Sequence, residues 1–368
     1  MRAGLKSPME AMRGVRVVPL LALLLAALLL AGCSNTSFYW QATSGHFSIL
    51  NKRRPIEKVL QDPATPADTA RKLRLIQQVQ AFAALELALP ERGHYRYYAD
   101  LGRPYVSWLV VAAQPLALEE HSFCYLIVGC LGYKGFFDKE DARLEMEALR
   151  KTGLDVMMRP VTAYSTLGWF DDPVLNTFIR GSDIGLISTV IHELAHQVVF
   201  LPGETAFNES FAATVEEEGV RRFLAGDAEK AAMLAEYEAG EADSARFNAI
   251  LVAGRKKLEA LYAATLDGEE MRARKEEVFE SMREAYRAER NSFKVYHYES
   301  WFERPLNNAH MVGVGHYAEH VPAFRALLRQ SGGDFPRFYE AVIALGGLEP
   351  EKRAERLKEL ARAAMAAR

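Results

Sequence analysis

The sequence predicts an α+β protein that is mainly helical, with a small sheet and an inserted helical hairpin. Apolar residues recur at helical spacing in several long segments, of which residues 183–200 are the clearest. Residues 95–137 instead contain β-branched, aromatic and glycine-punctuated runs that are typical of strands. Residues 226–290 are highly charged and alanine-rich and contain two long helical patterns, which predict an exposed hairpin.

The composition fits a folded protein that does not bind nucleic acid. The chain has 368 residues, of which 49% are hydrophobic and 25% are charged, so it can bury a full core in one large or two smaller domains. Lysine and arginine number 45, against 48 aspartate and glutamate residues. Binding to a phosphate backbone needs a basic excess, so we expect no nucleic-acid partner.

The first 32 residues have the form of a signal peptide. Arg13 and Arg16 precede an uninterrupted apolar run over residues 17–30, which is too short to cross a bilayer comfortably. Small residues and then Cys33 follow, and this order resembles the lipobox of bacterial lipoproteins, which implies a lipid anchor on Cys33. A plain secretory leader, or a short anchor helix with an unmodified Cys33, is the alternative.

The leader predicts a place in the bacterial cell envelope. Ser34 rather than aspartate follows Cys33, which by the bacterial sorting pattern resembles an outer-membrane lipoprotein whose body faces the periplasm. Cys124 and Cys130 lie six residues apart, and in an oxidising compartment we expect them to form a disulfide that closes a small loop. Two buried free thiols are the alternative.

Five segments follow from these patterns. Residues 1–32 are the signal peptide, and residues 33–61 show little periodicity and are expected to form a lipid-attached tether. Residues 62–225 are expected to form the core, and residues 226–290 form the charged hairpin. Residues 291–368 are expected to be a helical C-terminal part that completes the cleft of the functional site. The elements expected inside the core are a helix over 65–89, strands in 95–137, a helix over 138–151, strands and turns in 156–179, and helices over 183–200 and 205–224.

The helix over residues 183–200 carries a metal-binding motif. It contains His192, Glu193 and His196, and a spacing of four places the two imidazoles one turn apart on one face, where they can hold one metal ion. Glu193 is one position further round the helix and can reach a metal-bound water instead of the ion. Catalytic zinc needs three protein ligands and an open position, so a third ligand must come from a nearby element.

The next helix offers that ligand. Pro202 and Gly203 turn the chain, and an antiparallel second helix would bring Glu209 back to the metal. Glu216 lies seven residues further along the same face, where it could accept the free N–H of a ligand histidine. The alternatives are an exposed first-turn glutamate for Glu209 and a solvated helix face for Glu216.

These motifs carry a resemblance to known peptidases. The run HELAH, followed by NESFAATVE from Asn208, resembles the gluzincin metallopeptidases, and its second half is similar to an element of zinc aminopeptidases. The wider pattern is similar to a family of predicted bacterial aminopeptidases carried as lipoproteins, and it spans most of the chain after the leader. That wider pattern consists of the lipobox, DLGRPYVSWLVVAA, the segment around Gly129 and Cys130, AYSTLGWFDDPVL, and Asn307, Asn308 and Ala309.

The resemblance implies a zinc-helix core like that of the gluzincins and thermolysin, with one Zn²⁺ per chain. It implies His192, His196 and Glu209 as zinc ligands and Glu193 as general base. The expected function is hydrolysis of short peptides as an aminopeptidase in the envelope. The chain lacks the GxMEN element by which large zinc aminopeptidases anchor the substrate amine, so an endopeptidase of the same mechanism is an alternative. A second alternative is a non-catalytic lipoprotein that uses residues 226–290 as an interaction surface.

Two further roles are open at this point. A donor to the oxyanion is expected from the C-terminal segment. The candidates are Tyr317, which is preferred, and His297, His310 and His316, with an ordinary core or surface role as the alternative for each. Asp171 or Asp172 could meet a free amino terminus, and the alternative is that they form a turn. Two imidazoles and a carboxylate also suit divalent ions other than zinc.

Overall fold

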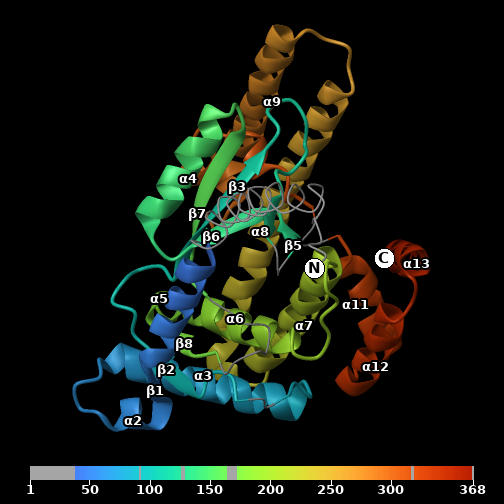
Figure 1. Cartoon of the computed structure of the whole chain (residues 1–368). Coiled ribbons are helices and arrows are strands. Elements are labelled where there is room, and N and C mark those ends of the chain that lie inside the picture. The colour runs from blue at the N-terminus through green and yellow to red at the C-terminus, as the bar shows by residue number, and fades with distance from the viewer. Residues whose placement is uncertain (1–37, 91–92, 126–128, 164–171, 316–318, 367–368) are drawn as a thin grey trace, which may run out of the picture.

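The computed structural model describes residues 38–366, except 91–92, 126–128, 164–171 and 316–318. It confirms the predicted class, because the described chain is mainly helical with small sheets (Figure 1). The longer helices are residues 38–51, α3 (Ala67–Glu86), α4 (Lys139–Lys151), α6 (Asp183–Ala195), α7 (Thr205–Ala225), α8 (Ala231–Tyr262), α9 (Gly268–Glu289), α11 (Val321–Gln330), α12 (Phe335–Gly346) and α13 (Pro350–Ala366). The shorter ones are α2 (Ile56–Gln61), α5 (Asn176–Ile179), α10 (Glu299–Phe302), η1 (Ala228–Lys230), η2 (Arg290–Ser292) and η3 (Asn308–His310).

The described strands form three small sheets. The first has the order β1 (Arg53–Pro55), β2 (Tyr97–Ala99) and β8 (Val174–Leu175), in which β2 and β8 are parallel. The second places β3 (Ser107–Ala113) between β6 (Tyr133–Phe136) and β7 (Asp155–Val161), with both pairings antiparallel. The third is the hairpin of β4 (Phe123–Tyr125) and β5 (Gly129–Leu131).

Both faces of β3 are covered, which explains its uninterrupted apolar sequence. Val110 and Ala112 point to one face, where they pack with Ala142 of α4. Val111 and Ala113 point to the other face, against η3 and the residues that follow it. A strand that is buried on two sides has no solvent-facing positions and therefore no polar alternation.

The main core lies among α3, α6, α7 and the three C-terminal helices. Phe207 and Phe211 of α7 pack edge to face on Phe324 of α11, and Phe211 also contacts Phe338 of α12. All four side chains are at most 1% exposed. Aromatic packing on α11 and α12 therefore fixes the first turns of α7, which carry Glu209.

The predicted charged hairpin exists as α8 and α9, which extend away from the main body (Figure 1). It has a core of its own, in which Leu258 and Phe279 are 0% exposed. Gly254 lets α9 approach closely, because a Cβ there would meet the sulfur of Met282 at 2.3 Å. The hairpin is thus a packed element, and charged positions occupy its outer surface.

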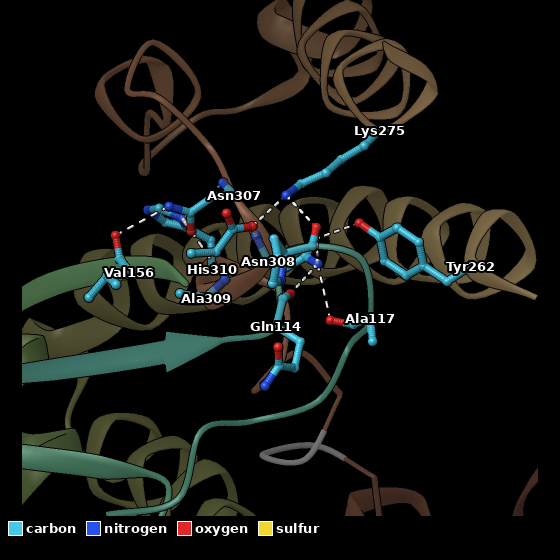
Figure 2. Close-up of polar contacts among 11 residues, drawn as sticks. Gln114, Ala117, Val156, Tyr262, Lys275, Asn307, Asn308, Ala309 and His310 are labelled. Atoms are coloured by element: carbon cyan, nitrogen blue, oxygen red, sulfur yellow. Dashed lines mark hydrogen bonds and ion pairs between the residues drawn. The ribbon is translucent and has the colours of Figure 1, made fainter. Parts of the chain in front are cut away.

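A buried polar network joins this hairpin to the sheet of β3 and β7 (Figure 2). Asn308 is 0% exposed, and its Nδ2 lies within hydrogen-bond distance of the carbonyl oxygens of Gln114, Pro115 and Ala117, at 2.8, 3.2 and 3.1 Å. Its Oδ1 accepts a hydrogen bond from the hydroxyl of Tyr262 at 2.8 Å, and its backbone N–H donates to Asp155. Lys275 of α9 donates to the same carboxylate of Asp155 and to the carbonyl of Pro115.

The prediction of a tether over residues 33–61 is wrong for the part that the structure describes. Residues 38–51 are helical, and Gln41 donates a hydrogen bond to the carbonyl of Gly135 in β6 at 2.8 Å. Ile49 and Ile56 are each 1% exposed. A few apolar contacts, this hydrogen bond and the pairing of β1 with β2 hold the segment on the body, and they give the sequence no visible period. None of the helices in the described part has the length and apolar character needed to cross a membrane.

Candidate functional site

The helix α6 buries one face and leaves the other polar. Its first turn is capped by Ser182, whose hydroxyl accepts a hydrogen bond from the backbone N–H of Gly185 at 3.1 Å. Ile187 is fully buried in the main core. His192 and His196 are one turn apart, at the C-terminal end of this helix. The burial of the apolar face therefore fixes the direction of both imidazoles.

A tight turn connects α6 to α7 and positions Glu209. Gly203 has a φ of +81°, which favours glycine over every other residue. The side chain of Asn208 closes the turn, because its Oδ1 accepts from the N–H of Leu201 and its Nδ2 donates to the carbonyl of Leu201, both at 2.8 Å. Asn208 is 3% exposed and directly precedes Glu209. The role of Asn208 in this turn was not predicted, and an asparagine soon after Pro202 and Gly203 is the signal in the sequence that could have indicated it.

Three side chains converge where the two helices meet. The Nε2 atoms of His192 and His196 are 3.2 Å apart. Oε2 of Glu209 is 3.3 Å from Nε2 of His192, and Oε1 of Glu209 is 3.7 Å from Nε2 of His196. Tetrahedral ligands bonded to zinc at about 2.0–2.1 Å are about 3.3 Å from one another. The donor set and its spacing therefore fit a zinc ion, and it is the one such group of His, Cys, Asp or Glu among the described residues.

Glu216 supports one of these histidines. Its Oε2 is 3.0 Å from Nδ1 of His192, the ring nitrogen that faces away from His196. Burial lowers the pKa of His192, but hydrogen bonds to Glu209 and Glu216 outweigh burial and raise it to about 10. Burial and the charge of His192 lower the pKa of His196 to about 4. In the absence of an ion, the group therefore holds a proton on His192 and keeps His196 neutral.

Glu193 is half-buried on the flank of α6. Asp172 is only 3% exposed, with Oδ2 3.6 Å from Nδ1 of His94. His310 belongs to the network around Asn308 and has Nδ1 2.9 Å from Oδ1 of Asn307. His297 is exposed. The other candidates, Tyr317, His316, Asp171 and Cys33, lie outside the described residues.

Cys124 and Cys130 form a disulfide in the structure, across the pairing of β4 with β5. The two residues face each other in the strand register. Close to this hairpin, the ring of Tyr125 stacks on Phe38 with a centroid separation of 3.9 Å. The disulfide thus lies where the first described helix meets the rest of the molecule.

The fold and this site define a mainly helical α+β protein with a His–His–Glu group that is spaced to hold a divalent ion. A family profile described as "Putative aminopeptidase" matches residues 37–357. The chain belongs to this family, and its membership suggests peptide hydrolysis. No curated protein and no solved structure was significantly similar to the chain.

Proposed function

We propose that the chain is a zinc-dependent metallopeptidase of the gluzincin type, which hydrolyses short peptides as an aminopeptidase. The observation that carries this proposal is the convergence of His192, His196 and Glu209 with separations of 3.2 to 3.7 Å. The family profile supports the reaction class, since peptide hydrolysis is what its description suggests. The ligand set of two histidines and a glutamate is one that catalytic zinc uses in peptidases.

A zinc ion bound there would polarise the scissile carbonyl and lower the pKa of a coordinated water. Glu193 would accept a proton from the attacking water and later deliver it to the leaving amine. Glu216 accepts the N–H of His192, which fixes the ring with its Nε2 toward Glu209 and His196. Each of these roles belongs to a side chain on α6 or α7, so the reacting groups are held on two packed helices.

We further propose that the protein acts in the bacterial envelope, anchored by a lipid on Cys33 and facing the periplasm from the outer membrane. The lipobox-like order of residues before Cys33 supports the anchor. A disulfide between Cys124 and Cys130 is consistent with an oxidising compartment. The substrate is then a peptide that reaches the periplasm, and the membrane is reached through the lipid.

The test is hydrolysis of a mixed peptide library by the purified protein loaded with zinc, with Glu193→Gln as its matched variant. The proposal predicts stepwise loss of N-terminal residues by the natural protein and none by Glu193→Gln. Internal cleavage would replace the aminopeptidase with an endopeptidase. Zinc binding without any hydrolysis would favour a non-catalytic interaction module.

A further inference from the structure

The helix over residues 38–51 packs one of its faces on the body. Oε1 of Gln41 accepts a hydrogen bond from the backbone N–H of Phe137 at 3.2 Å. A Cβ at position 45 would clash with the ring of Phe137, so glycine there lets the helix lie close to the body. Ile49 is 1% exposed. Positions four apart share a helix face, so these contacts define the inner face of the helix.

The opposite, outer face of this helix carries two exposed aromatic side chains. Trp40 is 76% exposed and Phe47 is 55% exposed, and they are the two most exposed aromatic side chains among the described residues. They are seven positions apart, so they lie on one side of the helix, two turns from each other. Thr43, Ser44 and Ser48 are exposed beside them. The outer face thus presents aromatic rings and hydroxyl groups to its surroundings.

This outer face is also without charge. The sequence has no Asp, Glu, Lys or Arg between Cys33 and Lys52. Burial lowers the pKa of His46, so this ring is neutral at neutral pH as well. By contrast, most of the 13 residues of α4 are charged, as is usual for a helix face in water. Two exposed aromatic rings on an uncharged face are instead typical of a surface that meets an apolar partner.

The sequence places this face next to the proposed lipid. Trp40 is seven residues after Cys33, and seven residues span at most about 25 Å. The first charged residues after Cys33 are the cations Lys52, Arg53 and Arg54, directly beyond the helix. Aromatic residues such as tryptophan favour the membrane–water interface, and cations beside a bilayer attract anionic headgroups. The helix and its flanks therefore have the composition of a segment that lies on a lipid surface.

We propose that the outer face of the helix over residues 38–51 docks on the phospholipid surface, with the rings of Trp40 and Phe47 among the headgroups. This inference rests on the lipid anchor of the proposed function. The lipid brings the helix to the bilayer, and the two rings hold the body in a fixed orientation to it. The helix lies on the membrane and does not cross it, because its inner face stays packed on the body through Gln41 and Ile49.

The test is the fluorescence of the full lipidated protein in vesicles of phosphatidylethanolamine and phosphatidylglycerol whose acyl chains are brominated near the headgroups. Bromine quenches tryptophan only at close range, and the chain has four tryptophans. We expect the brominated lipid to quench part of the emission, and Trp40→Phe to abolish this quenching. Phe47→Ser removes apolar area from the same face and should reduce the quenching about twofold.

Two matched controls accompany these variants. Trp301→Phe removes a tryptophan of α10 and should leave the quenching in place. Leu85→Ser removes an apolar side chain of α3 that is 83% exposed and should leave it unchanged. All four substituted side chains except Trp301 are exposed, so the variants at those positions should fold as the natural protein does.

The absence of quenching in the natural protein would overturn the inference, as would equal quenching in the natural protein and either Trp40→Phe or Phe47→Ser. If Trp40 is shielded from aqueous iodide but is not quenched by the brominated lipid, a second copy or another protein covers this face, which also overturns the inference. Intact mass measures the lipid separately. A lipidated protein without quenching contradicts this inference alone, whereas a protein without the lipid contradicts the proposed anchor and this inference with it. Peptide hydrolysis by the same sample tests the proposed reaction independently of both.

Discussion

The network around Asn308 is a buried polar cluster and the group around His192 is a half-buried one, and they differ in how far their members satisfy one another. In the network, Asn308 uses both ends of its amide, and Asp155 accepts from two donors (Figure 2). In the group, the Nε2 atoms of two imidazoles face each other at 3.2 Å, and they can do so only with a proton or a cation between them. The first cluster is complete as it stands, and the second has acceptors directed at a shared point.

This difference separates a structural cluster from a functional one. Buried polar groups in a folded protein are almost always paired, so a complete network needs no ligand to explain it. A cluster whose lone pairs converge costs free energy unless a cation or a proton lies between them. Nδ1 of His196 adds to this contrast, because it is buried without a hydrogen-bond partner in the described structure. Three substitutions and one titration test this contrast.

The largest effect is expected from Glu193→Gln. Removal of the general base should lower kcat by about 10²- to 10⁴-fold, because the amide cannot accept the proton of the attacking water. Zinc content should stay near that of the natural protein, since Glu193 is not one of the converging ligands. Kinetics with a peptide substrate and elemental analysis of the same sample measure both. Retention of activity would remove Glu193 from the mechanism.

Removal of the Asn308 side chain should lower the stability of the protein without lowering its zinc content. Asn308→Ala leaves the Tyr262 hydroxyl without its acceptor and two carbonyl oxygens without their donor, since the carbonyl of Pro115 keeps its bond from Lys275. Each unsatisfied buried group costs about 1–3 kcal/mol, so we expect the free energy of unfolding to fall by about 3 kcal/mol or more. Urea unfolding measures this, with the exposed Asn291→Ala as control. An Asn308→Ala protein of unchanged stability would contradict the comparison.

A smaller effect is expected from Glu216, whose carboxylate contacts Nδ1 of His192. Glu216→Gln keeps the shape of the side chain but removes the charge that faces Nδ1 of His192. Loss of such a partner lowers metal affinity by about 10- to 100-fold. Competition with a chelator of known zinc affinity measures this, and Glu218→Gln, whose natural partner is Arg222 on the same helix, serves as control. Equal zinc affinity in both variants would show that Glu216 does not support the site.

The last prediction concerns the single proton that zinc binding should release. Because the pKa of His192 is raised to about 10 in the metal-free group, zinc must displace a proton from it at neutral pH. The apparent zinc affinity should therefore rise about tenfold per pH unit between about pH 7 and 9 and level off above about pH 10. His196, whose pKa is lowered to about 4, contributes no proton in this range. Calorimetry in two buffers of different ionisation enthalpy counts the proton, and a count of zero would contradict the paired state of His192.

The sequence was sufficient for the parts of the site that depend on local spacing. His192, His196, Glu209 and Glu216 come together because positions four and seven residues apart share a helix face, and a short turn joins the two helices. The mainly helical class followed from the same periodicity. The burial of Asp172 was not predictable in this way, because the residue packs beside His94, which is far away in the chain.

Other features depend on contacts that a single sequence does not reveal. The Asn308 network joins residues that are more than 150 positions apart, such as Asp155 and Asn308. The left-handed backbone of Tyr95 has no signal in residue type, since tyrosine disfavours that conformation. The packing of residues 38–61 depends on a few apolar side chains, on Gln41 and on the pairing of β1 with β2, and none of these leaves a periodic pattern.

The most direct test of the central claim is the zinc content of the purified protein, measured by elemental mass spectrometry beside His196→Ala. If the converging side chains form a metal site, the natural protein holds about one zinc per chain and the variant holds almost none. If the natural protein holds no zinc even after reconstitution with the ion, the group around His192 is no metal site and the proposed mechanism is contradicted.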